Sequence, residues 1–239
     1  MIRLENLVKR FGDVAAVNGL NLEVPPGELF AFVGPNGAGK TTTIKLIAGL
    51  LRPTAGRVFL CGYDVQQDYI AARSLLSYVP DQPFLYDKLT GREFLRFIAS
   101  MYAMDRVDAD RTIARMSELF ELEGFLDELS QTYSHGMKQR VVMSAALLHH
   151  PRVLVLDEPM VGLDPKGART LKTVLRQLTK EGATVFFSTH ALDVAEETAD
   201  RVGIIREGSL VALGTLDEIY AAARTDRRLE QAFLRLTEE

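Results

Sequence analysis

A glycine-rich segment early in the chain carries the clearest chemistry in the sequence. Residues 34–41 read GPNGAGKT, which fits the pattern G-x-x-x-x-G-K-[ST]; the apolar run LFAFV precedes them and the helical pattern TTTIKLIAGLL begins at their end. Glycines let backbone N–H groups turn toward an anion, and the N-terminus of the following helix adds the positive end of its dipole. The segment is therefore predicted to bind the phosphates of a nucleotide.

Individual residues of this loop have separate predicted roles. Lys40 is placed to reach the β- and γ-phosphates, and the hydroxyl of Thr41 is expected to bind Mg²⁺, which prefers oxygen ligands. The predicted phosphate-binding set is completed by Gly34, Pro35, Asn36, Gly37, Ala38, Gly39 and Thr42. A plain glycine-rich turn with a solvated lysine is the competing interpretation, and the flanking strand and helix patterns favour the phosphate loop over it.

A pair of acidic residues follows the apolar run VLVL much later in the chain. Asp157 and Glu158 would stand at the C-terminal end of a buried strand, where open α/β sheets bind their ligands. Asp157 is expected to hold Mg²⁺ through water, and Glu158 to polarise a water for in-line attack on the γ-phosphate. A pair of acids that merely caps a helix is the alternative, which the upstream phosphate loop disfavours.

Further motifs resemble those of the ATP-binding cassette (ABC) ATPases, and they occur in the order that this family requires. Residues 133–140, YSHGMKQR, are similar to the family's signature sequence, usually written LSGGQ. Residues 162–165, GLDP, are similar to its D-loop, so Asp164 is the D-loop aspartate. His190, at the end of TVFFSTH, falls at the position of the family's switch histidine, and Phe11 matches its adenine-stacking aromatic.

This resemblance implies a site that two chains share. The signature residues would face the ATP bound by another subunit, so that two chains would sandwich two ATP molecules head to tail. The predicted signature contacts are Ser134, His135, Gly136 and Met137. Taken alone, these residues could equally be a serine N-cap at the start of a helix running from about 137 to 149.

Two other residues gain their role from the resemblance as well. Phe11 offers a flat apolar face for an adenine ring, although a lone aromatic is more often part of a core or a turn. His190 ends an apolar strand where its ring could bond to the γ-phosphate, although a lone histidine is more often structural. The presence of the other motifs favours the functional interpretation of both Phe11 and His190.

The chain departs from the family's pattern at two places. Asp81 stands where the family's Q-loop glutamine is expected, and Gln82 comes next, so both are candidates for that role. Simple surface exposure of the two is the alternative. In the signature, His135 replaces a glycine and Met137 replaces the glutamine, which puts the usual ribose-side contact in doubt.

The arrangement of apolar runs predicts an α/β fold with a P-loop NTPase core, in which helices flank a mostly parallel sheet. The first thirty residues, punctuated by FGD and PPG, predict a small N-terminal antiparallel β layer, beginning with a strand in MIRLENLVKRFG. We expect a single ABC ATPase domain over 1–239. Its nucleotide-binding core would comprise 1–80 and 150–239, and a helical subdomain with the signature would occupy about 82–149.

The predicted helical subdomain has its own pattern. Residues from about 90 to 129 are mostly helical in pattern, with a capping box formed by Thr90 and Glu93. Two apolar stripes are expected to form its core. The first comprises Phe94, Leu95, Phe97, Ile98, Met101 and Tyr102, and the second comprises Ile113, Met116, Leu119 and Phe120.

Turn and cap residues mark the remaining elements. Gly182 is expected to end the helix between the runs VLVLDE and TVFFSTH. Glu207 and Gly208 suggest a hairpin turn. Thr215 with Glu218 repeats the capping-box pattern ahead of a last pair of helices.

Length and composition limit the classes to which this protein can belong. The 239 residues suffice for one domain with a subdomain around a sizeable core, and the net charge of −4 leaves no positive excess to attract nucleic acid or anionic lipid. No nucleic-acid partner is therefore expected. No apolar run is long enough to span a bilayer and no secretory signal is recognisable, so any membrane role requires a partner.

The cysteine and the histidines suggest no disulfide and no zinc site. A single cysteine, Cys61, favours a reducing compartment, and we expect it to be a packed core thiol. His135, His149 and His150 show no metal-ligand spacing with cysteine or acidic partners.

The resemblance to the ABC ATPases implies an ATPase subunit of an ABC transporter that uses ATP and Mg²⁺. Its expected partners are a second ATPase chain and separate polytopic membrane permease subunits, and its expected place is peripheral, on the cytoplasmic face of the cell membrane. The signature form YSHGM and the closing segment LEQAFLRLTEE resemble bacterial drug and polysaccharide exporters. Two alternatives are a soluble ABC-type switch that acts on nucleic acid or ribosomes, and a nonhydrolytic scaffold; acidic charge with a single cassette, and the presence of Glu158 and His190, disfavour them respectively.

Overall fold

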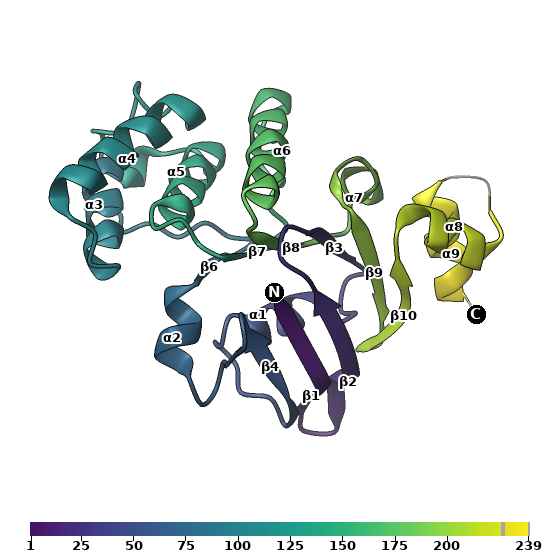
Figure 1. Cartoon of the computed structure of the whole chain (residues 1–239). Helices are drawn as coiled ribbons and strands as arrows, with labels where there is room; N and C mark the ends of the chain where they lie inside the picture. The colour runs from purple at the N-terminus through teal and green to yellow at the C-terminus, as the bar shows by residue number, and fades with distance from the viewer. Residues whose placement is uncertain (226–227, 239) are drawn as a thin grey trace.

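The central element of the fold is a six-stranded sheet with the order β10-β9-β3-β8-β7-β6. The computed structural model describes residues 1–225 and 228–238. Five strands run parallel, and β10 pairs antiparallel with β9 at one edge (Figure 1). The strands are β3 (Leu29–Val33), β6 (Leu76–Val79), β7 (Val153–Asp157), β8 (Thr184–Thr189), β9 (Arg201–Arg206) and β10 (Ser209–Gly214).

A second, antiparallel sheet is built largely from the N-terminal segment and has the order β2-β1-β4-β5. Its strands are β1 (Ile2–Phe11), β2 (Val14–Val24), β4 (Ala55–Leu60) and β5 (Tyr63–Asp64). The predicted first strand, the N-terminal antiparallel layer and the mostly parallel core sheet are therefore confirmed.

The three central strands of the parallel sheet are fully buried, because helices or the second sheet cover both faces. On one face, Phe30 stacks on Phe186 with ring centroids 5.4 Å apart, and this layer packs against α1 (Lys40–Ile47) and the antiparallel sheet. On the other face lie α6 (Pro165–Lys180) and α7 (Leu192–Thr198) (Figure 1). Burial on both sides explains why these strands read as unbroken apolar runs.

The helical subdomain stands beside the β6 edge of the sheet (Figure 1). Its helices are α3 (Gly91–Met101), α4 (Arg106–Phe120), the short 3₁₀ turn η1 (Ser130–Thr132) and α5 (His135–Leu147). The capping box of Thr90 and Glu93 is confirmed at the start of α3. Helix α5 begins two residues earlier than predicted, because Ser134 caps it at its first turn.

The two predicted apolar stripes are only partly buried. Phe94, Leu95, Ile113, Met116 and Phe120 lie in the core as predicted. The prediction is wrong for four other members, because more than a third of each of these residues is exposed to solvent. Their exposed fractions are 42% for Phe97, 67% for Met101, 38% for Tyr102 and 37% for Leu119.

Most predicted turns and caps are confirmed. Gly182, with φ 93°, follows α6 and donates its N–H to a carbonyl of the last helical turn. Glu207 and Gly208, both with positive φ, connect β9 to β10. The capping box at Thr215 begins α8 (Leu216–Ala223), which pairs with α9 (Leu229–Glu238) at the far edge of the sheet. The last residue of the predicted closing segment, Glu239, lies outside the described residues.

Two further features concern the surface and connections. Cys61 is only partly the core thiol expected from the sequence: it packs against the core but is half-buried in the turn between β4 and β5, with φ 50°. The short helix α2 (Tyr69–Ser74) connects β5 to β6. Among residues 1–225 and 228–238, no helix has both the length and the apolar character needed to cross a bilayer.

Candidate nucleotide site

The glycine-rich loop, the acidic pair and His190 meet at one edge of the parallel sheet. This follows from the topology, because the loop continues β3, the acidic pair ends β7 and the histidine follows β8, and these strands are parallel neighbours. Together they surround a cavity of about 330 Å³. Its lining residues are Ala16, Asn36, Gly37, Gly39, Lys40, Thr41, Thr42, Asp81, Asp157, Glu158 and His190.

The backbone of the loop requires glycine at two positions. A Cβ at Gly34 would lie 2.4 Å from the carbonyl oxygen of Ile205, and one at Gly39 would lie 2.3 Å from that of Ala16. Gly39 also has φ 109° and is the N-cap of α1, where no described side chain caps the helix. The first-turn N–H groups of α1 are therefore left for a ligand such as a phosphate.

Lys40 is folded back onto the loop that carries it. Its Nζ donates to the carbonyl oxygens of Gly34, at 2.6 Å, and Pro35, at 3.2 Å. Burial lowers the pKa of Lys40, while the carboxylates of Glu158 and Asp157 oppose that shift. The ammonium group is therefore bonded to the loop carbonyls and lies near enough to the acidic pair to interact with its charges.

Asp157 presents an oxygen that fits a cation. The residue is 1% exposed, and its Oδ1 accepts a hydrogen bond from the hydroxyl of Ser188. Its Oδ2 is buried and has no hydrogen-bond partner among the described residues. A buried carboxylate oxygen without a partner is costly, and a cation or its bound water would relieve that cost.

The chemistry of the surrounding oxygens suits Mg²⁺. Thr41 lines the same cavity as Asp157, and both offer the hard oxygen ligands that Mg²⁺ requires. The described residues contain no group of three or more His, Cys, Asp or Glu that could hold a metal by itself. A Mg²⁺ ion at this place would therefore take most of its ligands from phosphates and water.

Glu158 and His190 are in direct contact. The Nδ1 atom of His190 lies 2.8 Å from Oε1 of Glu158. Glu158 has φ 49° and donates its N–H to the carbonyl and the hydroxyl of Ser188, both at 3.2 Å. Ser188 thus holds both acidic residues in place, a role that sequence reasoning missed; a serine inside the apolar run TVFFSTH is the signal that could have found it.

The two Q-loop candidates differ in position. Asp81 lines the cavity, whereas Gln82 is not among the lining residues, although both are exposed. Burial, followed by the negative charges of Asp157 and Asp81, raises the pKa of Tyr78 to about 12. Asp81 thus adds its charge to the same acidic edge.

The signature residues lie away from this cavity. Ser134 caps α5, with its Oγ accepting the N–H of Met137 at 3.3 Å, so the simple N-cap interpretation is true of the single chain. Ser134 and His135 are exposed. The ring of His135 packs on Gly162, where a Cβ would lie 2.1 Å from His135 Cδ2.

The D-loop segment makes a second contact with the signature. A Cβ at Gly136 would lie 2.9 Å from the carbonyl oxygen of Gly162. Asp164, the predicted D-loop aspartate, caps α6 by accepting the N–H of Gly167 at 2.8 Å. Neither Gly136 nor Asp164 lines the cavity.

Phe11 lies outside the lining of the cavity, whereas Ala16 is part of it. Phe11 lies at the end of β1, 52% exposed, with Lys9 Nζ 5.0 Å from its ring centre, and it is not among the residues lining the cavity. Its adenine-stacking role stays a prediction. Ala16, which has no chemical signal in the sequence, lines the cavity because β2 passes behind Gly39.

Comparisons with known proteins agree with this geometry. The family model described as ABC transporter matches residues 17–161. The probable multidrug ABC transporter ATP-binding protein YbhF of Escherichia coli is 38% identical over 99% of this chain, which spans 41% of that relative's length. The linearmycin resistance ATP-binding protein LnrL of Bacillus subtilis is 35% identical over 92% of this chain and 70% of its own length.

Solved structures give the same result. A structure described as the ATP binding subunit of an ABC transporter is 32% identical, with a TM-score of 0.94 and 99% of both chains covered. A dimeric ATP-binding cassette in a post-hydrolysis state, bound to ADP and Pi, is 26% identical, with a TM-score of 0.83 over 90% of this chain and 99% of that one. The resemblance drawn from the motifs is confirmed, and the chain belongs to the ABC transporter family, with the fold of its ATP-binding cassettes.

Proposed function

We propose that this chain binds and hydrolyses MgATP as the ATP-binding subunit of an ABC exporter. The observation that carries the proposal is the cavity in which the phosphate loop meets Lys40, Asp157, Glu158 and His190. These groups combine anion binding, oxygen ligands for a cation and a carboxylate base within one small space. The relatives YbhF and LnrL are named for transport and resistance, which favours this function over a switch that acts on nucleic acid.

The phosphate loop holds the triphosphate. The backbone N–H groups of the loop and of the first turn of α1 bind its oxygens. Lys40 exchanges its loop carbonyl partners for the β- and γ-phosphates, a move that restores full charge stabilisation to a partly desolvated ammonium group. Thr41 and Asp157 would hold Mg²⁺, which when bound neutralises charge on the phosphates.

Glu158 is the proposed base. Its carboxylate accepts the proton of a water that attacks the γ-phosphate in line. His190 orients that carboxylate by donating a hydrogen bond to it from Nδ1–H. Asp81 is the proposed Q-loop residue, because it lines the cavity and Gln82 does not.

A second copy of the chain, or a paired cassette, completes the site. Ser134 and His135 are exposed and belong to no part of their own chain's cavity, which leaves them for another nucleotide. We therefore propose that the ATP of the opposite chain is contacted by Ser134, His135, Gly136 and Met137. We also propose that Asp164 lies at the interface between the two chains. The solved relative that is dimeric with ADP and Pi supports this arrangement.

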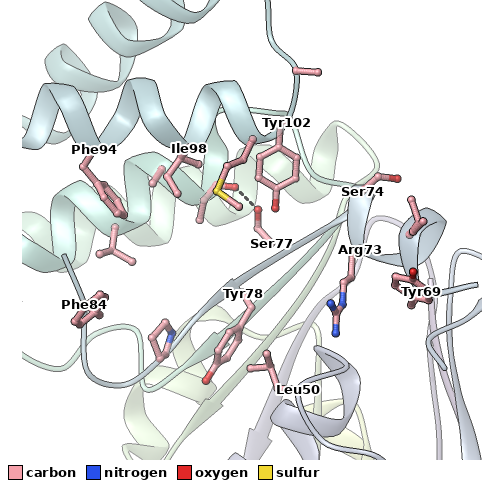
Figure 2. Close-up of a pocket in the computed structure, with 17 residues that line it drawn as sticks. Leu50, Tyr69, Arg73, Ser74, Ser77, Tyr78, Phe84, Phe94, Ile98 and Tyr102 are labelled. Atoms are coloured by element: carbon pink, nitrogen blue, oxygen red, sulfur yellow. Dashed lines mark hydrogen bonds between the residues drawn. The ribbon is translucent and has the colours of Figure 1, made fainter. Parts of the chain in front are cut away.

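The proposed membrane partner docks in an apolar groove of about 870 Å³ between the core and the helical subdomain (Figure 2). Aromatic and aliphatic side chains dominate its lining, and several are widely exposed, such as Phe84 at 67% and Met101 at 67%. Exposed apolar patches of this kind mark interaction sites. The labelled lining residues are Leu50, Tyr69, Arg73, Ser74, Ser77, Tyr78, Phe84, Phe94, Ile98 and Tyr102.

Export, and a place on the cytoplasmic face of the membrane, belong to the same proposal. The relatives YbhF and LnrL are named for multidrug transport and for linearmycin resistance, which favours expulsion of a compound over uptake. The membrane permease that would carry the compound is a separate chain.

The experiment that tests the proposal uses the Glu158→Gln variant. With the base removed and the binding residues intact, MgATP should convert the variant from monomer to dimer in gel filtration, whereas ADP should not. The matched control is Glu123→Gln, which neutralises an exposed carboxylate of the helical subdomain. A Glu158→Gln chain that stays monomeric with saturating MgATP, or one that hydrolyses ATP as fast as the control, contradicts the proposal.

A further inference from the structure

We propose that the hydroxyl of Tyr133 is a positioning group that holds the signature in the orientation needed to bind the partner's ATP. It does so by joining the signature to the start of α3, one wall of the apolar groove. The inference rests on the proposed function and adds a residue to it.

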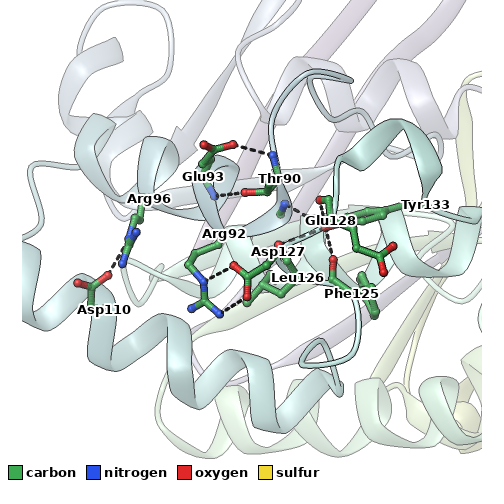
Figure 3. A network of polar contacts seen from close by, with 11 residues as sticks. Thr90, Arg92, Glu93, Arg96, Asp110, Phe125, Leu126, Asp127, Glu128 and Tyr133 are labelled. Atoms are coloured by element: carbon green, nitrogen blue, oxygen red, sulfur yellow. Dashed lines mark hydrogen bonds and ion pairs between the residues drawn. The ribbon is translucent and has the colours of Figure 1, made fainter.

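Tyr133 is the hub of a buried polar cluster (Figure 3). The residue is 6% exposed, and its Oη accepts the backbone N–H of Gly91 at 3.0 Å. The same oxygen lies 2.8 Å from the carbonyl oxygen of Phe125, 3.0 Å from that of Glu128 and 3.3 Å from that of Leu126. A hydroxyl has one proton, so it donates fully to one of these carbonyls, of which Phe125 is the nearest.

The surroundings leave the phenol little freedom. A Cβ at Gly91 would lie 2.7 Å from Tyr133 Oη, so the backbone of α3 approaches the hydroxyl as closely as glycine allows. The ring of Phe125 meets that of Tyr133 edge-on, with centroids 5.0 Å apart. Burial raises the pKa of Tyr133, which keeps the hydroxyl protonated and able to donate.

The segment around this cluster is tied to α3 by further bonds. Arg92 forms a two-point ion pair with Asp127, at 2.7 and 2.9 Å, and its backbone N–H donates to the carbonyl of Leu126 at 3.0 Å (Figure 3). Helix α3 and the turn at 125–128 are therefore bonded to each other at several points, and Tyr133 connects them to Ser134, the next residue in the chain.

Tyr133 connects two parts of the chain that have different binding partners in the proposed function: helix α3, which faces the membrane subunit, and the signature, which faces the partner's ATP. Phe94 and Ile98 of α3 line the groove, whereas Ser134 begins the signature. A segment that seats in the groove and displaces α3 carries the signature with it through the phenol. A leucine, the residue usual at this position of the signature, would fill the space without making any of these hydrogen bonds.

Removing the hydroxyl alone separates positioning from packing. Tyr133→Phe keeps the ring and its edge-on contact but leaves the buried N–H of Gly91 without its acceptor. The ATP that the same chain binds lies in the cavity, which Tyr133 does not line. The variant should therefore impair binding to the partner's nucleotide and spare binding of the chain's own.

The test compares variants in the Glu158→Gln background. Affinity of the dilute monomer for a fluorescent ATP analogue is one readout, and the protein concentration for half-maximal dimer formation with MgATP, from sedimentation velocity, is the other. Tyr133→Phe should raise that concentration about tenfold, the scale of one lost buried hydrogen bond, with unchanged monomer affinity. Gly91→Ala, which pushes a methyl against Oη, should do the same.

The matched control is Asp105→Ala. It removes the N-cap of α4 in the same subdomain, where Asp105 accepts the N–H of Val107 at 2.8 Å, and makes no contact with Tyr133. It should lower the melting temperature and leave dimer formation unchanged. Dimer formation by both Tyr133→Phe and Gly91→Ala at the parent's concentration, or equal weakening by Asp105→Ala, overturns the inference alone. Failure of the Glu158→Gln parent to form dimers overturns the proposed function, and this inference with it.

Discussion

His190 Nδ1 and Glu158 Oε1 lie 2.8 Å apart, which joins the residue after β8 to the residue after β7. The glutamate side chain is 16% exposed and the histidine side chain 60%, so the contact joins a mostly buried residue to a solvent-exposed one. A carboxylate held in one direction by an imidazole is preorganised to accept a proton from water. The geometry thus separates orienting from proton transfer, and each can be tested.

Loss of the imidazole should reduce the rate of ATP hydrolysis more than it reduces the affinity for ATP. For His190→Ala we expect kcat to fall about 100-fold, because the base loses its orienting partner, while affinity for ATP changes by about threefold or less. Steady-state ATPase rates and equilibrium titration with a fluorescent nucleotide measure the two quantities. A kcat within twofold of the wild type would show that the contact has no part in the reaction.

Asp157→Asn should abolish the stabilisation by Mg²⁺ without destabilising the ligand-free protein. The buried Oδ2 has no hydrogen-bond partner among the described residues, so replacing the carboxylate removes a buried charge that is only partly compensated by Lys40 and Ser188. We expect the melting temperature without ligand to be equal or higher, and the rise produced by MgATP over ATP alone to disappear. A variant that keeps the wild-type rise with MgATP would exclude Asp157 from the cation site.

The loop should tolerate no side chain at Gly39. A Cβ there would lie 2.3 Å from the carbonyl of Ala16, and φ is 109°, so Gly39→Ala must displace the loop and lose ATP binding. Gly182→Ala is the matched control, with φ 93° and open space around its Cβ position. The control should lose about 1 kcal/mol of stability and keep its nucleotide affinity. Equal nucleotide binding by both variants would contradict this account of the loop.

Stability should decrease in mild acid through His149. Burial lowers the pKa of His149 to about 4, and Tyr102 stacks on its ring with centroids 3.6 Å apart. Between pH 6.5 and 4 the unfolded chain binds the proton that the folded chain refuses, so the free energy of unfolding falls as the pH drops through that window and is restored above it.

A variant isolates this contribution. His149→Phe keeps an aromatic partner for Tyr102 and cannot titrate. Urea unfolding at pH 7 and pH 5 should show a smaller acid-induced loss for the variant, by about 1 kcal/mol after allowance for partial solvent access. Equal losses in the two proteins would exclude His149 as the titrating group.

The parts of the site that could be predicted from sequence are those that the chain arranges locally. The loop follows β3, and Asp157 ends β7; parallel strands then bring both to one edge, so the pattern of apolar runs was sufficient. The helix caps at Thr90 and Thr215 could also be predicted, because a capping box involves residues only three positions apart.

Other features depend on contacts between distant segments. Ser188 holds Asp157 from a neighbouring strand, and the ring of His135 packs on Gly162 of the D-loop, pairs that no local pattern specifies. The apolar spacing of α3 failed to distinguish core from groove, because Met101 faces an open surface that itself requires apolar residues.

The shared site is tested most directly by mixing two inactive chains. Lys40→Ala removes the cradle for the chain's own phosphates, and Ser134→Ala removes the contact to the opposite nucleotide. If each site combines Lys40 of one chain with Ser134 of the other, the mixture contains one intact site in every mixed dimer and regains ATPase activity that neither variant has alone. Activity of the mixture no greater than the mean of its two components would contradict the account.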